Sequence, residues 1–292
     1  MNYAGIELGG TKCVAILARG PDDIIARETA PTTAPEATLD ALERILVRWR
    51  EQHGIDSLGI ASFGPVGLHS DSPTWGHVLT TTKPGWSGTD VAPRFAERLG
   101  VPVGFETDVN GAALAEMRWG AGQGMRDFAY ITVGTGVGVG LVVNGHPTRG
   151  FLHSELGHVR VAERAGEEWD GVCPFHGSCV EGLASGPAIK ARIAPRDVDQ
   201  IGPDDLVWDA VAWAIAQLCH VIVCAAAPGA IAIGGGVMER QPHLLRRIDA
   251  MLRQSLGEYM RLPLQSGYVR APALGSDAGP LGAIALAMTA RR

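Results

Sequence analysis

Three potential soft metal ligands lie close together near the middle of the chain. Cys173, His176 and Cys179 are separated by gaps of two residues, and a fourth ligand, His158, lies upstream. Zinc binds thiolate sulfur and imidazole nitrogen in tetrahedral sets of this kind, and four protein ligands leave no open position for a catalytic water. The spacing therefore predicts a structural zinc ion. His153 competes with His158 for the fourth position, and the alternative is a group of core residues without a metal.

Two carboxylates, Glu155 and Glu181, flank this cluster. A single glutamate is most often a solvated surface acid. Beside a metal both carboxylates would be held rigidly, and rigid carboxylates are good acceptors for the hydroxyl groups of a sugar. One ring nitrogen of His158 can bind zinc while the other contacts a sugar hydroxyl. The cluster therefore predicts a sugar-binding region that a metal supports.

Three glycine-rich turns each follow a β-like run: Gly9-Gly10-Thr11, Gly134-Thr135-Gly136 and Gly234-Gly235-Gly236. Glycine lets the backbone approach a phosphate closely, and neighbouring hydroxyl and amino groups can contact its oxygen atoms. Such groups belong to Thr11, Lys12, Thr132 and Thr135. One turn alone is as well explained by an ordinary hairpin, and neither a P-loop nor a G-x-G-x-x-G fingerprint is present. Three turns at strand ends predict phosphate binding in a common cleft.

Asp108 lies between a predicted strand and a predicted helix. One interpretation is a helix N-cap, a position that Asp fills often. The other is a general base, which would accept the proton of a substrate hydroxyl as that oxygen attacks the γ-phosphorus of ATP. Asn110 could hold a neighbouring hydroxyl.

The elements that would position these groups follow from hydrophobic periodicity. Strands are expected at residues 3–8, 13–18, 23–29, 57–63, 101–106, 128–133, 137–143 and 231–233. Helices are expected at 35–49, at about 110–119 ended by Gly120, and at 276–288. Residues 64–89 form a polar loop or lid, in which Trp86 is the one tryptophan that could stack on a sugar. The hairpin of residues 3–18 recurs at 128–143, which predicts two similar halves with a boundary between 120 and 127.

Composition restricts the class of partner and the location. The net charge is −6, the pI is about 5.8 and no long Lys/Arg run is present, which argues against nucleic acid and anionic membranes. Five cysteines, two of them in the metal-like cluster, favour a reducing cytosol, and no export signal is visible at the N-terminus. The apolar run 211–233 contains Gln217 and His220 and is broken by Pro228-Gly229, so a buried helix followed by a strand is expected rather than a membrane span.

Five motifs occur in order over nearly the whole chain, and in them the sequence resembles the ROK family of sugar kinases and repressors. They are Glu7-Leu-Gly-Gly-Thr-Lys12, Thr107-Asp108-Val-Asn110, Thr132-Val-Gly-Thr-Gly-Val-Gly138, Glu155-Leu-Gly-His158 and Cys173-Pro-Phe-His-Gly-Ser-Cys-Val-Glu-Gly-Leu-Ala-Ser-Gly-Pro187. Glu7, the Thr107-Asp108 pair, the loop from Thr82 to Trp86 and the C-x-x-H-x-x-C spacing are most similar to the zinc-containing bacterial fructokinases.

The resemblance implies an α/β fold of two actin-like, ribonuclease-H-like domains with an ATP and sugar cleft between them. The domains are expected at residues 1–122 and 123–276, with a zinc-binding insertion at 153–187 and a C-terminal helix at about 277–292 that packs back onto the first domain. It also implies a cytoplasmic homodimer that phosphorylates a hexose with ATP. The first candidate substrate is D-fructose, with fructose 6-phosphate as the product. Glucokinase, mannokinase and N-acetylhexosamine kinase are the alternatives within the family, and a non-catalytic sugar sensor or a zinc hydrolase are the alternatives outside it.

The resemblance also assigns roles to matching residues. The catalytic base is Asp108, and the structural zinc ligands are His158, Cys173, His176 and Cys179. Sugar contacts are assigned to Gly64, Pro65, Asn110, Glu155, His158 and Glu181. ATP and phosphate contacts are assigned to Gly9, Gly10, Thr11, Lys12, Thr132, Gly134, Thr135, Gly136, Pro187, Gly235 and Gly236.

The cofactors expected from the resemblance are ATP, Mg²⁺ and Zn²⁺, and the partners are small molecules only. Glu7 departs from the Asp that is common in the family at a position linked to magnesium and phosphate. The repressor branch carries an N-terminal helix-turn-helix domain, and here the first strand is expected within a few residues of Met1. We therefore expect no DNA-binding domain.

Overall fold

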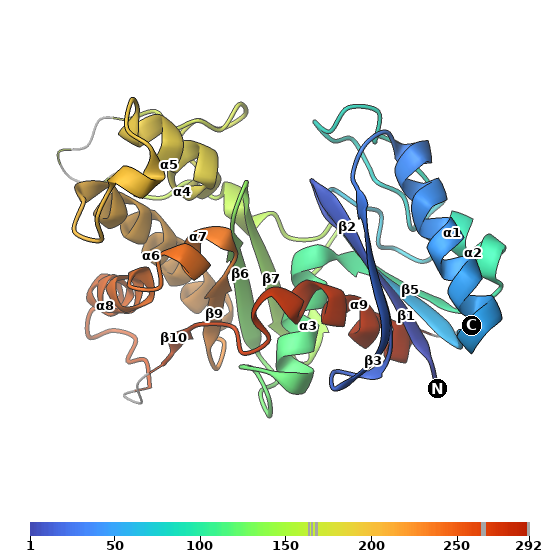
Figure 1. Ribbon diagram of the computed structural model, residues 1–292. Coiled ribbons are helices and arrows are strands. Elements are labelled where there is room, and N and C mark those ends of the chain that lie inside the picture. The colour runs from blue at the N-terminus through green and yellow to red at the C-terminus, as the bar shows by residue number, and fades with distance from the viewer. Residues whose placement is uncertain (163, 165, 167–168, 264–266, 291–292) are drawn as a thin grey trace. The chain divides into compact units, whose positions relative to one another are not determined.

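The computed structural model describes residues 1–162, 164, 166, 169–263 and 267–290 (Figure 1). The chain forms two compact units, one of Met1–Gln123, Pro147–Ser154 and Ser276–Arg292, the other of Gly124–His146 and Glu155–Gly275. Residues 163, 165, 167 and 168 of the expected zinc-binding insertion, and the last two of the expected C-terminal helix, lie outside the described residues.

The first unit is built on a mixed five-stranded sheet with the order β3-β2-β1-β4-β5. The strands are β1 (Tyr3–Leu8), β2 (Lys12–Gly20), β3 (Asp23–Pro31), β4 (Ser57–Ser62) and β5 (Val103–Thr107). β1 pairs antiparallel with β2 across the first glycine turn and parallel with β4, and β4 pairs parallel with β5. The predicted hairpin and the mixed strand order are confirmed.

Helices cover both faces of this sheet (Figure 1). The alternation of side chains along β1 and β4 decides which helices pack on which face. The helices are α1 (Pro35–His53), α2 (Ala92–Leu99), α3 (Asp108–Trp119) and α9 (Ala278–Thr289). Ile6 and Ile60 point into one core with α1 and α2, whose apolar residues recur at helical spacing. On the other face a Cβ at Gly59 would lie 1.9 Å from the carbonyl oxygen of Ala283. Glycine in β4 therefore lets α9 lie directly on the sheet.

The second unit repeats the hairpin in another five-stranded sheet, ordered β10-β9-β6-β7-β8. Its strands are β6 (Phe128–Val133), β7 (Val137–Val143), β8 (His146–Pro147), β9 (Ile231–Gly234) and β10 (Val269–Arg270). β6 pairs antiparallel with β7 across the second glycine turn, and parallel with β9. The predicted repeat of a glycine-bent hairpin is thus confirmed.

The helices of the second unit are α4 (Val180–Ala184), α5 (Gly186–Ile193), α6 (Leu206–Ala226), α7 (Gly236–Arg240) and α8 (Leu244–Leu256), with short 3-10 turns η1 (Leu156–His158), η2 (Val198–Gln200) and η3 (Gly275–Asp277). By length and composition α6 could span a membrane, but 67% of its apolar window is buried inside this unit. α6 packs against α8 and α4 and is followed by β9. The prediction of a buried helix followed by a strand is confirmed.

The polar segment 64–89 is a packed loop. Val66, Val78 and Trp86 are fully buried, and the indole nitrogen of Trp86 donates a hydrogen bond to the carbonyl of Thr33 at 2.9 Å. The ring of Trp86 also lies edge-on against Phe63, with 5.1 Å between centroids. Stacking of Trp86 on a sugar is therefore wrong, because its side chain is fully buried in the core of the first unit.

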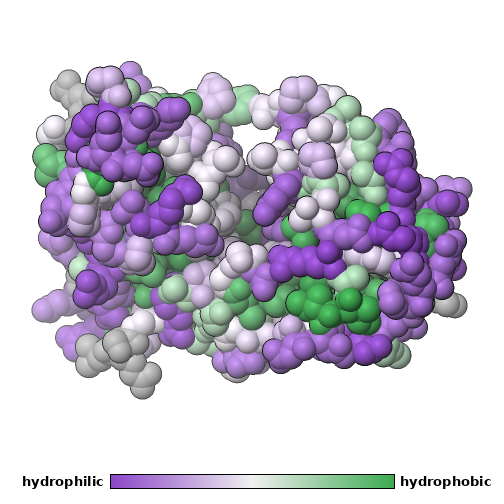
Figure 2. Space-filling view, viewed as in Figure 1, coloured by the Kyte–Doolittle hydropathy of each residue, from purple (hydrophilic) through white to green (hydrophobic). Residues whose placement is uncertain are grey.

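Hydrophilic residues predominate on the face shown in Figure 2, with smaller areas of hydrophobic residues between them. Among the described residues, Phe151 and Tyr259 are the most exposed large hydrophobic side chains, each at 96%. The apolar residues that fill the two sheet-and-helix cores are instead buried. The hydrophobic effect thus stabilises each unit from within its own core.

Candidate active site

The four predicted metal ligands lie together in the second unit. Nδ1 of His158 is 3.8 Å from Sγ of Cys173 and 3.6 Å from Sγ of Cys179, and Nδ1 of His176 is 3.7 Å from Sγ of Cys173. All four ligand atoms lie within 4.8 Å of one another. A tetrahedral zinc ion with ordinary bond lengths separates sulfur and nitrogen ligands by roughly 3.6 Å. The donor set and its spacing therefore fit zinc.

Local packing brings these ligands together. Cys179 caps α4, with its Sγ accepting the backbone N–H of Gly182 at 3.5 Å. A Cβ at Gly182 would lie 1.9 Å from the carbonyl oxygen of Gly177, and one at Gly157 would lie 1.8 Å from that of Val137. Two glycines thus let the ligand loop lie on α4 and let η1 lie on β7. Burial first of all, together with the neighbouring Cys173, raises the pKa of the Cys179 thiol to about 11. Binding of a metal must therefore displace that proton.

His153 has a different environment from His158. It belongs to the first unit, where its Nε2 accepts the N–H of Val66 at 3.1 Å. Within the described part of the chain, His158 completes the cluster with the two cysteines and His176. The geometry thus favours His158 over His153 as the fourth ligand.

Glu181 connects the metal-like cluster to the second glycine turn. Its Oε2 accepts the backbone N–H of Val137 at 3.1 Å, and its Oε1 lies 4.0 Å from Nε2 of His158. A Cβ at Gly136 would lie 2.5 Å from Oε2 of Glu181, so glycine is needed for this approach. Glu155 is exposed and precedes η1, where its carbonyl accepts the N–H of His158 at 3.0 Å. His158 and Glu181 therefore form a direct pair, with Glu155 one 3-10 turn away.

The predicted phosphate-binding residues of the second unit meet at one end of its sheet. Thr132 pairs with Gly234 across β6 and β9. Gly235 has a φ of +87°, and a Cβ there would lie 2.6 Å from Oγ1 of Thr132. The N–H of Gly186 donates to the carbonyl of Gly134 at 2.7 Å, which brings the start of α5 and Pro187 to the same place. The second and third glycine turns, which were expected at strand ends facing a common cleft, are thus neighbours.

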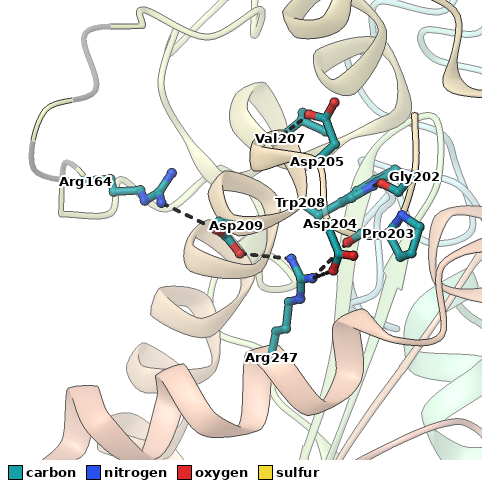
Figure 3. A network of polar contacts seen from close by, with 9 residues as sticks. All are labelled: Arg164, Gly202, Pro203, Asp204, Asp205, Val207, Trp208, Asp209 and Arg247. Atoms are coloured by element: carbon teal, nitrogen blue, oxygen red, sulfur yellow. Dashed lines mark hydrogen bonds and ion pairs between the residues drawn. The ribbon is translucent and has the colours of Figure 1, made fainter. Parts of the chain in front are cut away.

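A cavity of about 330 Å³ adjoins these turns, and its wall includes Gly186, Lys190, Asp197, Trp208, Val237 and Arg240. The polar network in Figure 3 supports this wall. The indole nitrogen of Trp208 donates to the carbonyl of Gly202 at 2.9 Å, and Arg247 from α8 donates to Asp209 at 3.0 Å. These contacts fix the first turn of α6. Lys190 and Arg240 were not predicted from the sequence, because single cations on amphipathic helices resemble solvated surface residues.

Asp108 occupies the first position of α3 in the first unit. The N-cap is Thr107, whose Oγ1 accepts the N–H of Asn110 at 3.2 Å. The interpretation of Asp108 as the N-cap is therefore wrong, because the hydroxyl of the preceding residue holds that place. Oδ1 of Asp108 accepts the N–H of Val109 at 2.9 Å, and the positive end of the helix dipole favours the ionised carboxylate.

Glu7 lies on the α9 face of β1, near Asp108. Burial first of all, and then the negative charge of Asp108, raise the pKa of Glu7 from its usual 4.5 to about 7, against the lowering effect of Lys12. A Cβ at Gly279 would lie 2.0 Å from Oε1 of Glu7, so the carboxylate fills space that a glycine leaves open. The first unit therefore contains two interacting carboxylates at the end of its sheet.

The first glycine turn joins β1 to β2 next to these acids. Oγ1 of Thr32 donates to the carbonyl of Gly9 at 2.7 Å, and its N–H donates to that of Thr11 at 2.9 Å. Thr11 and Lys12 are exposed. The ammonium group of Lys83 donates to the carbonyl of Gly10. Lys83 is a cation at this turn that the sequence analysis missed, although it lies in the Thr82–Trp86 loop on which part of the family resemblance rests.

Gly64 and Pro65 are held by a segment that is distant in sequence. A Cβ at Gly64 would lie 3.2 Å from the imidazole of His153. Arg149 donates to the carbonyl of Leu68 at 3.3 Å. Residues 147–154, which the sequence analysis assigned to the C-terminal domain, therefore group with the first unit. Long-range contacts of Arg149 and His153 cause this placement.

The chain was compared with known proteins. The model of the ROK family matches residues 3–290. The fructokinase of Zymomonas mobilis is 39% identical over 295 residues, covering 99% of this chain and 97% of the relative. A ROK hexokinase from Thermus thermophilus has a TM-score of 0.81 at 28% identity, covering 99% of this chain and 98% of the other. A ROK family glucokinase from Streptomyces griseus, solved in complex with glucose and AMPPNP, has a TM-score of 0.79 at 28% identity and 99% coverage of both chains.

These likenesses agree with the two mixed sheets and their helices, and they confirm the predicted α/β, two-domain, actin-like kinase fold. The family model and the near-complete coverage of the relative also agree with the order of the five motifs. The chain belongs to the ROK family.

Proposed function

We propose that this protein is an ATP-dependent hexose kinase whose preferred substrate is D-fructose, phosphorylated on its 6-hydroxyl. The observation that carries this proposal is the first turn of α3, where the carboxylate of Asp108 lies beside the buried amide of Asn110. The greater identity to a fructokinase, 39%, than to a hexokinase or a glucokinase, 28% each, supports fructose over glucose.

In the proposed reaction Asp108 accepts the proton of the sugar hydroxyl, whose oxygen forms a bond to the γ-phosphorus of ATP. The bond between that phosphorus and the β,γ-bridging oxygen breaks, and ADP leaves. Backbone N–H groups of the glycine turns and the ammonium of Lys12 stabilise the negative charge of the phosphates. Magnesium bound with ATP supplies further neutralisation of that charge.

The second unit supplies the nucleotide site in this proposal. Gly134 to Gly136, Gly235 and Gly236 offer backbone to phosphate groups, and Thr132 offers a hydroxyl. The neighbouring cavity of about 330 Å³ has a size suited to a small ligand and an aromatic wall at Trp208. The cavity would hold the adenosine part of ATP. The AMPPNP in the Streptomyces griseus complex supports ATP as the phosphate donor.

Zinc has a structural role in the proposal, held by His158, Cys173, His176 and Cys179. Four protein ligands complete its tetrahedron, so the metal would fix the ligand loop without taking part in phosphoryl transfer. His158 would then present Nε2 toward Glu181 and the sugar. The sugar contacts of this unit are His158, Glu181 and Glu155.

We further propose a cytoplasmic homodimer. The five cysteines are free, and two of them are needed as zinc ligands, which suits a reducing compartment. The dimer is implied by the resemblance to the family, and the molar mass in solution, by light scattering, tests it against the 30.7 kDa of one chain.

Release of ADP, measured with and without sugar, tests the kinase proposal. Sugar-dependent ADP release supports it. A protein that binds fructose in calorimetry but releases no ADP would instead be a sugar sensor. ADP release that does not depend on sugar, and that stops on chelation of the metal while the fold stays intact, would indicate a zinc hydrolase.

A further inference from the structure

Glu106 is a buried carboxylate directly before the catalytic turn. Its side chain lies at the end of β5 and the residue is 1% exposed. Oε1 accepts the N–H of Thr107 and the Nδ2–H of Asn110, both at 3.0 Å, and Oε2 accepts an N–H of the Arg149 guanidinium at 2.5 Å. A charge so deeply buried is costly unless donors surround it, and here three N–H groups do. The chemistry proposed above makes no use of this residue.

These contacts fix which end of the Asn110 amide is held. An ionised carboxylate only accepts hydrogen bonds, so the group of Asn110 that meets Glu106 is the NH₂. The carbonyl oxygen Oδ1 therefore points away from Glu106. This oxygen is buried and has no hydrogen-bond partner within the described residues. A buried acceptor without a partner is unfavourable, which points to a ligand that donates to it.

Arg149 extends the same arrangement to the loop after Gly64-Pro65. One guanidinium nitrogen meets Glu106, and another donates to the carbonyl of Leu68 at 3.3 Å. Glu106 thus joins the start of α3 to residues 147–154 and to the 64–89 loop. Two of these segments carry expected sugar contacts, Asn110 in α3 and Gly64-Pro65 at the start of the loop.

We propose that Glu106 is a positioning residue for the sugar: by holding the amide of Asn110, it makes Oδ1 accept a hydrogen bond from a sugar hydroxyl adjacent to the one that Asp108 deprotonates. This inference rests on the proposed hexose kinase function. It assigns a direction to the contact, with the sugar as donor and position 110 as acceptor. A sugar lacking that hydroxyl leaves Oδ1 without a partner and is rejected.

Exchange of the donor and the acceptor between positions 106 and 110 tests this direction. In Glu106→Gln one amide oxygen must serve both Arg149 and Asn110, while the new NH₂ group faces a donor. In Asn110→Asp two carboxylates face each other. In the double variant Glu106→Gln/Asn110→Asp the glutamine oxygen serves Arg149, its NH₂ donates to the aspartate, and the second aspartate oxygen remains an acceptor for the sugar. The N–H of Thr107 loses its acceptor there as it does in Glu106→Gln alone, so this loss cancels when the two variants are compared.

We expect each single variant to raise KM for the sugar about 10-fold or more, and the double variant to return it to within about 3-fold of wild type, while KM for ATP stays unchanged. Glu116→Gln is the matched control. Glu116 is a fully buried carboxylate on α3 that accepts the N–H of Ala121 at 2.6 Å. The control is expected to lower the thermal midpoint without raising KM for the sugar.

Either of two results would overturn the inference. One is an unchanged KM for the sugar in folded Glu106→Gln. The other is a KM for the sugar in the double variant that is raised by the product of the two single-variant factors. If Glu106→Gln alone does not fold, the comparison of Asn110→Asp with the double variant decides: recovery supports the inference and no recovery overturns it. The proposed kinase function is tested separately, by sugar-dependent ADP release from the wild-type protein. If the wild type shows no such release, the proposed function is wrong. Sugar affinity by calorimetry then still tests the positioning role.

Discussion

The carboxylate of Glu7 fills the space in which a side chain at position 279 would lie. A Cβ atom at Gly279 would be 2.0 Å from Oε1 and 2.5 Å from Cδ of Glu7. Position 7 carries Glu where Asp is common in the family, and the glycine at the start of α9 leaves room for that longer side chain. The same packing buries the carboxylate beside Asp108 and raises its pKa to about 7.

Glu7 should make the stability of the protein depend on pH. Between pH 4.5 and about 7 the folded protein keeps a proton that the unfolded chain has released. The free energy of unfolding therefore falls as pH rises through this window, by at most about 3 kcal/mol. Glu7→Gln removes this contribution, so the variant should gain stability relative to wild type as pH rises. Urea denaturation at several pH values from 4.5 to 8 measures this difference, and parallel curves for the two proteins would show that Glu7 is not responsible.

Asp108→Asn should abolish most of the turnover and leave sugar binding nearly intact. An asparagine keeps the size and the place at the start of α3 but cannot take up the proton of the hydroxyl. We expect kcat to fall by about 10²- to 10⁴-fold. Rates under saturating ATP and sugar, together with sugar binding by calorimetry, measure the two effects separately. Near-wild-type kcat in the variant would mean that another group is the base.

Removal of the metal should unfold the ligand loop rather than merely inactivate an intact fold. The four ligands come from η1, the Cys173–His176 loop and the N-cap of α4, and no disulfide joins these segments, because the cysteines are free. We expect one zinc per chain by elemental analysis, and a lower thermal midpoint after chelation or in Cys173→Ser.

Two histidine variants provide the matched comparison for the metal. His158→Ala should lose zinc and weaken sugar binding, whereas His153→Ala should retain zinc, because His153 bonds to Val66 in the first unit. Retention of full zinc occupancy by His158→Ala would exclude the proposed ligand set.

Gly136 and Gly134 should differ sharply in their effect on sugar binding. A Cβ at Gly136 would lie 2.5 Å from Oε2 of Glu181, whereas one at Gly134 would meet no atom within 4 Å. Gly136→Ala should therefore displace Glu181 from Val137 and raise KM for the sugar several-fold, roughly the value of one hydrogen bond. Gly134→Ala should leave KM for the sugar near wild type. Equal sugar KM values for the two variants would disprove the link between this turn and Glu181.

The sequence predicted elements whose pattern is local. The two glycine-bent hairpins, the apolar face of α1 and the end of α3 at Gly120 each depend on neighbouring residues, and the structure has them where the pattern placed them. The metal ligands were also predictable, because three of the four lie within seven residues of one another.

Long-range contacts account for what the sequence did not reveal. Glu106 reads as the exposed end of a strand, yet it is buried, and the donor that is distant in sequence is Arg149. Lys83 reads as a loop lysine, yet it reaches Gly10. The interpretation of Asp108 as an N-cap, one of the two that the sequence allowed, lies one residue late, because Thr107 and Asp108 are both good caps and the backbone of Thr107 has the extended conformation of a cap.

The most direct test of the account is a coupled assay of ADP release over a panel of fructose, glucose, mannose and N-acetylhexosamines, with the position of the phosphate identified by NMR spectroscopy. We predict the highest kcat/KM for D-fructose and fructose 6-phosphate as the product. A higher kcat/KM for glucose, mannose or an N-acetylhexosamine would contradict the assignment of the sugar. No sugar-dependent ADP release with any of them would contradict the assignment of the protein as a hexose kinase.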